Sequence, residues 1–498
     1  MASDAQPGDA GSLEETLQPI PEQARTTRVS GQFWIWAGAN IAPINWVLGA
    51  LGIQLGLGLS DTLVVLVGGN LVGMVLFGLF VLLGRRTGVT GMVLSRAAFG
   101  RRGGYVPATV QAVLAVGWCA VNTWIILDLV MALFGKLGLV DPSAPNYSAK
   151  IAVAVGIMVV QVVISWIGYR AISGFERWTV PPTIAVLVAM SLVAWTQLDI
   201  DWGYPGPAGH VLVGTERLAA MTAVMTAIGI GWGMTWFPYA ADYSRFVSRS
   251  VRPLRLYLAS ALGQFLPVVW LGVLGASLAT SSGQVDPGEL IVENFGALAI
   301  PVLFLVVHGP VATNIVNIYT FGLAAQALDL RLSRRSLSVL VGVLATACVV
   351  FFVFQSDFAT VLDSWLVSLV AWVASWGGIM LVHFYAIERG TDRICRLFDP
   401  VGSPRLPAVN WAAMTAFAAG VVATWLFMYG TVPVFRGPVA ASMGGVDLSW
   451  LAGGCVSTAV YAALGPRVHR RYLAQPGSTR ASGAARAGTR PEVAPDGR

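Results

Sequence analysis

The sequence is poor in charged residues for its length. Only 11% of its 498 residues are Asp, Glu, Lys or Arg, whereas soluble proteins carry about 25%. Hydrophobic residues make up 56% of the chain. None of the four cysteines has metal-ligand spacing, and three stand in apolar stretches, so neither a zinc site nor a disulfide framework is indicated. The composition excludes an ordinary soluble domain and predicts an integral membrane protein.

Both ends of the chain lack long apolar runs. Residues 1–30 are polar, contain three prolines and have no apolar core of a signal peptide. Residues 469–498 are rich in Ala, Gly, Arg and Pro. We expect both ends to be disordered cytoplasmic tails on one transmembrane domain at residues 31–468.

Between the tails, apolar segments recur at the length of a membrane-spanning helix, which is about 20 residues. We therefore predict an all-α protein with twelve transmembrane helices. They fall near residues 33–58, 62–84, 105–135, 149–169, 178–197, 217–240, 257–281, 297–327, 336–355, 358–386, 411–429 and 445–465.

The basic residues test this count, because Lys and Arg concentrate in cytoplasmic loops. With the N-terminus placed inside, the inner segments hold 27 of the 31 basic residues. The outer segments hold only Lys136, Lys150, Arg217 and Arg436. We therefore expect a multi-pass protein of the plasma membrane with both termini cytoplasmic. The net charge of +6 then lies against anionic membrane lipid, and no basic stripe suggests nucleic acid as a partner.

Two of the predicted spans are interrupted. The first contains Asn40, Pro43 and Asn45, and the sixth contains Gly229, Gly231 and Gly233. Interrupted helices at equivalent places in two halves are typical of a carrier's binding site. Spans 1 and 6 would be the first spans of the two halves, and they are five helices apart. Because five is an odd number, the second half would cross the membrane with the opposite topology. This pattern predicts an inverted repeat of spans 1–5 and 6–10, with spans 11 and 12 appended, although packing glycines are an alternative explanation.

Three spans carry pairs of polar or aromatic residues on one helical face. Indole rings offer flat faces for stacking, and an asparagine amide offers a donor and an acceptor side by side. This chemistry favours a small, planar, hydrogen-bonding heterocycle as the substrate. The alternatives are indoles at the membrane interface and amides that bond neighbouring helices. The pairs are Trp118 and Asn122, Trp232 and Trp236, and Asn314 and Asn317.

Ionisable residues within the spans are few. Asp128 follows Asn122 on span 3, and His308 precedes Thr313 on span 8. Buried ionisable groups in membrane proteins are expensive and mark ion pathways, so Asp128 and His308 are candidates for proton coupling. Asp242 and His383 are interpreted as helix-end groups at the cytoplasmic interface.

Several segments in order resemble the nucleobase:cation symporter-1 family, which includes permeases for cytosine, purines, allantoin and hydantoins. The resemblance runs over spans 1 to 10, and the segments on spans 8 and 10 resemble the purine–cytosine branch. It is carried by the region of Asn40, the segments at 95–100, 117–122, 314–319 and 364–366, and above all Trp236-Phe237-Pro238-Tyr239-Ala240-Ala241-Asp242-Tyr243-Ser244-Arg245.

The resemblance implies the 5+5 inverted-repeat fold of the amino acid–polyamine–organocation superfamily and a secondary cation symporter that imports a nucleobase by alternating access. It implies that Trp118 and a tryptophan of span 6 sandwich the base, and both Trp232 and Trp236 remain open as that partner. It further implies hydrogen bonds to the base from Asn122, Asn40 and an asparagine of span 8.

In sodium-coupled members of this family, carbonyls of span 1 and two hydroxyls of span 8 bind the ion. Here the corresponding positions are the region of Ala39 and the pair Ala312-Thr313, so one hydroxyl is missing. A proton is therefore preferred as the coupling ion, and sodium stays possible. No other cofactor or metal is indicated.

Other functions remain to be weighed against this one. A carrier of the same fold could transport allantoin, a hydantoin, hydroxymethylpyrimidine or an amino acid. A membrane enzyme would need clustered acids and histidines, and four scattered histidines do not supply them. A channel would need a repeated ring of pore-lining residues, which the sequence lacks.

Overall fold

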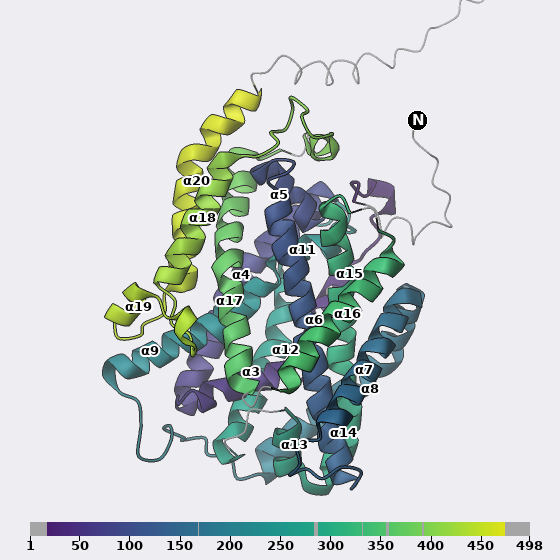
Figure 1. Cartoon of the computed structure of the whole chain (residues 1–498), viewed down its shortest axis with the longest axis vertical. Helices are drawn as coiled ribbons and strands as arrows, with labels where there is room; N and C mark the ends of the chain where they lie inside the picture. Colours follow the sequence, from purple (N-terminus) through teal and green to yellow (C-terminus); the bar gives the residue numbers. More distant parts are fainter. Residues whose placement is uncertain are drawn as a thin grey trace, which may run out of the picture.

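The computed structural model describes residues 17–167, 169–282, 287–330, 332–354, 358–390 and 393–473. These residues form an all-helical structure whose long helices run roughly parallel (Figure 1). The helices of the first half are α2 (Val29–Asn40), α3 (Ile44–Gln54), α4 (Leu59–Thr87), α5 (Gly91–Phe99), α6 (Tyr105–Lys136), α7 (Tyr147–Ile167) and α8 (Tyr169–Gln197).

The second half repeats long helices between shorter ones. They are α9 (Gly214–Val224), the π-helix η2 (Met225–Ile230), α10 (Gly231–Thr235), α11 (Phe237–Ser244), α12 (Pro253–Ser282), α13 (Pro287–Phe295), α14 (Ala299–Val306), α15 (His308–Ala327), α16 (Arg334–Val353) and α17 (Phe358–Leu381). The π-helix η4 (Val382–Ile387) then leads to α18 (Trp411–Leu426), α19 (Pro438–Ser442) and α20 (Ser449–Leu473).

Each predicted span contains one helix or a chain of helices. Within the described part of the chain, eight helical stretches are long and apolar enough to cross a membrane. Three further apolar helices are shorter, at Ile44–Gln54, Pro181–Gln197 and Trp411–Leu426. The protein therefore has several membrane-spanning helices, and the sequence predicted the position of each of these segments.

The predicted tails extend less far than expected. Residues 17–30 belong to the N-terminal tail by prediction, but Arg25 is buried and donates to the carbonyls of Ile20 (2.9 Å) and Arg85 (2.8 Å). A buried guanidinium needs such acceptors. The polar composition of the segment indicated a disordered tail and gave no sign of these contacts. At the other end α20 continues to Leu473, past the predicted boundary. Residues 1–16 and 474–498, the remainder of both tails, lie outside the described residues.

The first span is interrupted where the sequence predicts it. Helix α2 ends at Asn40, and α3 begins at Ile44. Pro43 cannot donate a backbone hydrogen bond to the preceding turn, so the helix cannot run through this point. The backbone carbonyl of Asn40 instead accepts a hydrogen bond from the Asn45 amide at 2.5 Å, so a polar contact bridges the break.

The sixth span changes helical form twice. Residues Met225–Ile230 make a π-helical turn, and the chain turns again at Trp236 between α10 and α11. Gly233 also packs closely against α4, because a Cβ atom added to it would lie 2.8 Å from Cα of Gly73. Gly233 therefore serves the packing of span 6 against α4.

The eighth span has a break that the sequence analysis missed. Helix α14 ends at Val306 and α15 begins at His308. Pro310 lies four residues after Val306, so the usual hydrogen bond to the carbonyl of that residue cannot form.

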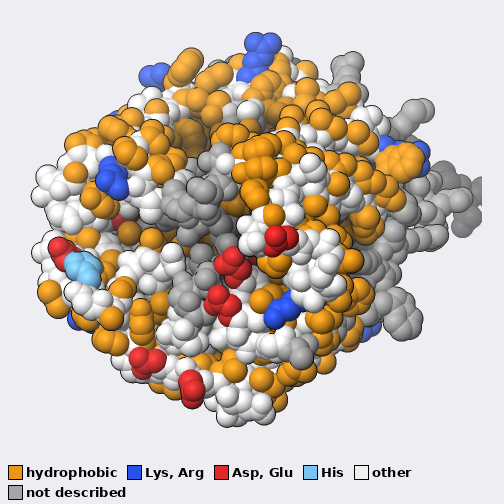
Figure 2. All heavy atoms as spheres, turned by 60° about the horizontal axis from the view of Figure 1, so that its bottom comes forward, with side chains coloured by type: hydrophobic (Ala, Val, Ile, Leu, Met, Phe, Trp, Pro, Cys, Tyr) orange, Lys and Arg blue, Asp and Glu red, His pale blue; other side chains and the backbone are white. Residues whose placement is uncertain are grey.

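The helices group by their packing. Spans 1 and 2 pack with spans 6 and 7, since α12 contacts α2, α3 and α4, and α11 contacts α4. Helices α6, α7, α15 and α16 form a second group of mutually packed helices. Helices α17, α18 and α20 pack together at one edge of the molecule (Figure 1). The end that carries α13 and α14 shows scattered acidic side chains among hydrophobic ones (Figure 2).

Candidate functional site

One face of span 6 supplies half of an enclosed cavity near the middle of the protein. Trp232, Thr235, Trp236 and Tyr239 line it, at relative positions i, i+3, i+4 and i+7. This spacing puts four side chains on one helical face even though α10 gives way to α11 between them. All four residues are buried.

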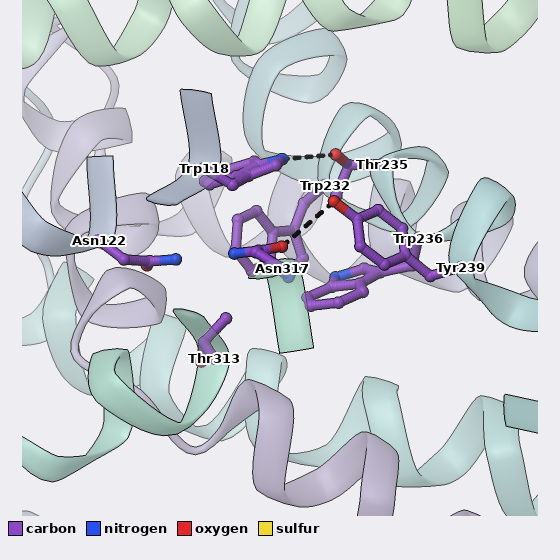
Figure 3. Close-up of a pocket in the computed structure, with 8 residues that line it drawn as sticks. All are labelled: Trp118, Asn122, Trp232, Thr235, Trp236, Tyr239, Thr313 and Asn317. Carbon is purple, nitrogen blue, oxygen red and sulfur yellow. Dashed lines mark hydrogen bonds between the residues drawn. The ribbon is translucent and has the colours of Figure 1, made fainter. Parts of the chain in front are cut away.

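The opposite walls come from α6 and α15. Trp118 and Asn122 line the cavity from α6, and Thr313 and Asn317 line it from α15 (Figure 3). Each pair is spaced i and i+4, so each is one turn of one helical face. The cavity therefore lies between the two groups of packed helices, where the sequence predicted a substrate site.

The indole rings close this cavity. The centre of a water molecule has only about 10 Å³ in which to move, enough for about one water. The ring of Trp118 meets that of Trp232 edge to face, with centroids 5.2 Å apart and planes at 86°. Trp232 and Trp236 are also perpendicular, at 6.2 Å. The rings do not form a parallel slot here, so a planar ligand requires them to separate.

An amide network holds Asn122. Its Nδ2 donates to Oδ1 of Asn314 at 3.1 Å. Asn314 donates in turn to the backbone oxygen of Cys119, to Thr123 and to Gln161, each at 3.0 Å. Asn314 thus lies behind the cavity and orients Asn122 rather than lining the cavity itself.

Two polar atoms of the cavity residues have no hydrogen-bond partner in the described structure. They are Oδ1 of Asn122, an acceptor, and Nε1 of Trp236, a donor. A buried unpaired polar group costs about 1–3 kcal/mol. These atoms are therefore suited to a ligand that presents both a donor and an acceptor.

Two further hydrogen bonds join polar groups of the cavity residues to one another (Figure 3). Nε1 of Trp118 donates to Oγ1 of Thr235 at 3.1 Å, and the hydroxyl of Tyr239 donates to Oδ1 of Asn317 at 3.2 Å. The sequence analysis missed Thr235 and Tyr239. The helical face of Trp232 and Trp236 would have found both, since it continues through positions i+3 and i+7.

Asn40 reaches the site through a tryptophan. Its Oδ1 accepts from Nε1 of Trp232 at 3.2 Å, and its Nδ2 donates to the carbonyl of Trp36 at 2.8 Å. Asn40 does not line the cavity. It joins the break in span 1 to the aromatic face of span 6 and fixes the indole of Trp232.

The residues expected to bind sodium lie together. Oγ1 of Thr313 is 3.3 Å from the carbonyl oxygen of Ala39 and 3.1 Å from that of Gly309. Thr313 also lines the cavity, so an ion here would be close to the substrate. Ala312 contributes no hydroxyl, as the sequence indicates.

Asp128, one of the two residues expected to bind a proton, does not line the cavity. Asp128 is six residues from Asn122, about 9 Å along α6. Its Oδ2 accepts from the backbone N–H of Gly288 at 2.6 Å, in the first turn of α13. The side chain of His308 lies outside the described part of the structure. Within the described residues, no three His, Cys, Asp or Glu side chains could hold a metal together.

The most specific segment of the family resemblance, 236–245, continues from the cavity to a helix end. Oδ1 of Asp242 accepts from the backbone N–H of Gly91 at 2.9 Å, which ties α11 to the start of α5. Nη2 of Arg245 donates to the hydroxyl of Tyr319 at 3.0 Å, which ties α11 to α15. The segment therefore runs from the cavity wall to contacts that fix α11 against α5 and α15.

The same end has an ion-pair cluster at the turn after α15. Asp329 has a left-handed backbone, with φ of 62°, and accepts from Nη2 of Arg101 at 2.8 Å and from the hydroxyl of Tyr105. Burial would raise the pKa of the Asp329 carboxyl, but the hydrogen bonds from Arg101 and Tyr105 outweigh it and hold that pKa below its usual value. Arg96 joins the cluster at 3.4 Å, so the turn is held to α5 and α6.

Comparisons with known proteins identify the family. A family profile described as "Permease for cytosine/purines, uracil, thiamine, allantoin" matches residues 19–453. A putative purine-cytosine permease of Bacillus subtilis, YxlA, is 26% identical over 468 residues, which cover 92% of this chain and 96% of that protein. The cytosine permease of Escherichia coli K12 is 23% identical over 429 residues, covering 84% of this chain and 90% of that protein.

Solved structures share the fold. Mhp1, described as a nucleobase-cation-symport-1 family transporter, in a closed conformation with bromovinylhydantoin bound, matches with a TM-score of 0.72. The match covers 93% of this chain and 98% of Mhp1, at 18% identity. A second structure of Mhp1, facing inward, matches with a TM-score of 0.71 at 19% identity.

The apolar spanning helices, the family profile and the permease relatives define a multi-pass membrane transport protein rather than an enzyme. Since the family profile covers most of the sequence, the chain belongs to the family of permeases for cytosine/purines, uracil, thiamine and allantoin. This confirms the family that the sequence motifs predicted.

Proposed function

We propose that this protein is a secondary active symporter that imports a nucleobase, such as cytosine or a purine, by alternating access. The observation that supports this most is the cavity, which combines three indoles with Asn122 and Asn317. Relatives named as purine-cytosine and cytosine permeases share most of the chain's length. An indole stacks on any flat base, and an amide pairs with a base edge.

In the proposed complex the base lies between Trp118 and an indole of span 6, either Trp232 or Trp236. The perpendicular contact of Trp118 with Trp232 gives way to a base stacked between rings. Oδ1 of Asn122 then accepts from the base, and the unpaired Nε1 of Trp236 makes that residue a donor or a stacking partner. Asn40 and Asn314 act through Trp232 and Asn122, which they hold.

We propose twelve transmembrane helices in a 5+5 inverted repeat, with both termini on the cytoplasmic side of the plasma membrane. The packing of spans 1 and 2 with 6 and 7, and of spans 3 and 4 with 8 and 9, is the grouping that two equivalent halves would give. The distribution of 27 of 31 basic residues in the inner segments supports the orientation.

A proton is the proposed coupling ion, and sodium is the alternative. Only one hydroxyl, that of Thr313, faces the carbonyl of Ala39, so a sodium ion would lack one expected ligand. Asp128 and His308 are the proposed titratable groups, because both stand on helices that line the cavity.

A ligand screen tests the proposed substrate. Purified protein is heated with cytosine, adenine, hypoxanthine, uracil, allantoin, hydantoin, hydroxymethylpyrimidine or leucine, since a ligand of the native state raises the melting temperature. We expect the largest rise with cytosine or a purine, and competition by the same compound for uptake of the radiolabelled base. A rise with hydantoin alone would instead match the ligand class of the Mhp1 structure. A rise with leucine alone would identify an amino-acid carrier.

A further inference from the structure

A groove on the outer surface of the protein runs between α7 and α16, which pack side by side (Figure 1). Each helix lines it with one stripe of residues at i, i+3, i+4, i+7 and i+8, which is one helical face. From α7 these are Val155, Met158, Val159, Val162 and Val163. From α16 they are Val339, Gly342, Val343, Thr346 and Ala347.

The groove is apolar and open to its surroundings. Its volume is about 520 Å³, and the side chains of Val159 and Val343 are 55% and 62% exposed. Gly342 forms its floor, because a Cβ atom there would lie 2.4 Å from a methyl group of Val162. Both helices belong to membrane-spanning stretches, so the medium outside the groove is lipid hydrocarbon.

A cation stands at one end of this groove. The stripes continue by one turn to Trp166 on α7 and to Arg335 on α16, and the guanidinium of Arg335 lies 5.3 Å from the ring centre of Trp166. Both side chains are exposed. Among the ion pairs of the described residues, none involves Arg335, so its charge is open to a ligand.

We propose that this groove binds one acyl chain of an anionic phospholipid, whose phosphate pairs with Arg335. From Arg335 to Ala347 the groove follows α16 for about 18 Å, close to the hydrocarbon thickness of one leaflet, about 15 Å. A basic side chain at the end of an apolar groove between spanning helices is the arrangement that recognises an anionic headgroup. With the proposed orientation, Arg335 faces the cytoplasmic leaflet.

The experiment is a lipid titration of the purified full-length protein followed by native mass spectrometry. Phosphatidylglycerol and phosphatidylcholine with identical chains are compared in wild type, in Arg335→Gln, and in Arg467→Gln as a matched exposed arginine on α20. One arginine near a lipid surface should favour the first phosphatidylglycerol adduct by about fivefold. Arg335→Gln should abolish this preference, and Arg467→Gln should retain it.

The apolar part of the site is tested with Val343→Trp, which fills the groove, and with Val422→Trp, an exposed valine on α18, as its control. Val343→Trp should weaken the first adduct of both lipids, and Val422→Trp should weaken neither. Diacylglycerol, which has no phosphate, should bind the wild type and Arg335→Gln equally. Inorganic phosphate alone should not displace phosphatidylglycerol.

Three results would overturn the proposal. The first is a phosphatidylglycerol preference that survives Arg335→Gln or falls equally with Arg467→Gln. The second is displacement of the lipid by inorganic phosphate, which would reduce the site to an anion contact. The third is a dimer that Val343→Trp dissociates while lipid binding stays unchanged, because the groove would then be an interface between copies of this chain.

Discussion

At the scale of single residues, Trp118 contributes to the site through both its ring face and its ring nitrogen. In the proposed complex Trp118 stacks on the base, so Trp118→Ala should lose about 1–3 kcal/mol of base binding, or roughly five- to 150-fold in affinity. Trp118→Phe should retain part of the affinity, since a ring remains while the bond to Thr235 is lost. Isothermal titration with the base found in the ligand screen measures both.

The control for this change is Trp425→Ala, because Trp425 is 46% exposed on α18, outside the cavity. Its base affinity should equal that of the wild type. If Trp118→Ala binds the base as tightly as this control, Trp118 serves helix packing alone.

Asn122 has one amide atom paired and one unpaired, so its substitutions separate two roles. Asn122→Ala should cost about 1–3 kcal/mol of base binding and also leaves Oδ1 of Asn314 without its donor. Asn122→Gln keeps the amide but moves it, and should change the ranking of bases rather than abolish transport. The ranking is measured by how strongly each base of a panel competes with uptake of a radiolabelled base. Equal losses for every base would mean that Asn122 only bonds neighbouring helices.

The cavity residues show what spacing predicts and what it does not. Trp118, Asn122, Trp232, Trp236 and Asn317 were predicted from paired spacings, and all line the cavity. Asn314 was predicted with them, but it does not line the cavity. It accepts a hydrogen bond from Asn122 instead. A helical face can be drawn from sequence, whereas the partner of a polar side chain across the bundle depends on tertiary packing.

At the scale of the helix, the contact between Gly233 and Gly73 sets how closely span 6 approaches α4. Gly233→Ala would place a Cβ atom 2.8 Å from a backbone atom of Gly73, and such overpacking costs about 1–3 kcal/mol. We expect a lower melting temperature in detergent, measured by differential scanning fluorimetry.

Gly68→Ala on α4 is the matched control, because nothing lies within 4 Å of a Cβ atom at that position. Alanine is the better helix former by about 0.5–1 kcal/mol, so this variant should be as stable as the wild type or more so. Equal melting temperatures for the two variants would show that the helices separate at no cost.

Helix breaks were predictable where two signals coincide. The interruption of span 1 combines a proline with buried asparagines, and it was predicted within a residue or two of its place. The break of span 8 has only Pro310 in a very apolar stretch, and a proline inside a membrane helix is often accommodated without one. Its position follows from packing against neighbouring helices, which the sequence alone does not contain.

At the scale of the whole molecule, the alternation of charge predicted more spans than helix length alone supports. Eight described stretches pass a test of length and hydropathy, because interrupted or short spans such as Ile44–Gln54 fail it. Basic residues in the loops orient the spans whether or not the helices between them are interrupted. The count therefore depends on the loops, whereas the detailed shape of each span depends on tertiary contacts.

The proposed topology of twelve spans with both termini cytoplasmic yields a direct prediction. Tags at either terminus should be reached by a membrane-impermeant reagent only after the cell is opened. A cysteine introduced at Asn146, in the loop before α7, should react from outside in intact cells. Labelling of the two termini from opposite sides would exclude an even number of spans.

Coupling can be tested without disturbing the structure around Asp128. Asp128→Asn removes the charge but keeps an oxygen that can accept from the N–H of Gly288. In vesicles, uptake should follow an inward proton gradient, persist without sodium and stop with a protonophore. Asp128→Asn or His308→Ala should uncouple net uptake, while exchange of base for base survives.

Sodium is the alternative that this experiment distinguishes. Uptake that requires sodium and ignores a protonophore at clamped voltage would transfer the coupling role to the carbonyl of Ala39 and the hydroxyl of Thr313. Thr313→Val would then abolish the response to sodium, and Asp128→Asn would leave it unchanged.

The closed aromatic cavity also has an electrical consequence. A proton or a hydrated ion crosses a protein along a continuous file of water, and the space between Trp118, Trp232 and Trp236 holds about one molecule. The edge-to-face contacts of the three rings fill this path. In this conformation the protein should conduct no ions, so a cell that expresses it should keep its membrane potential.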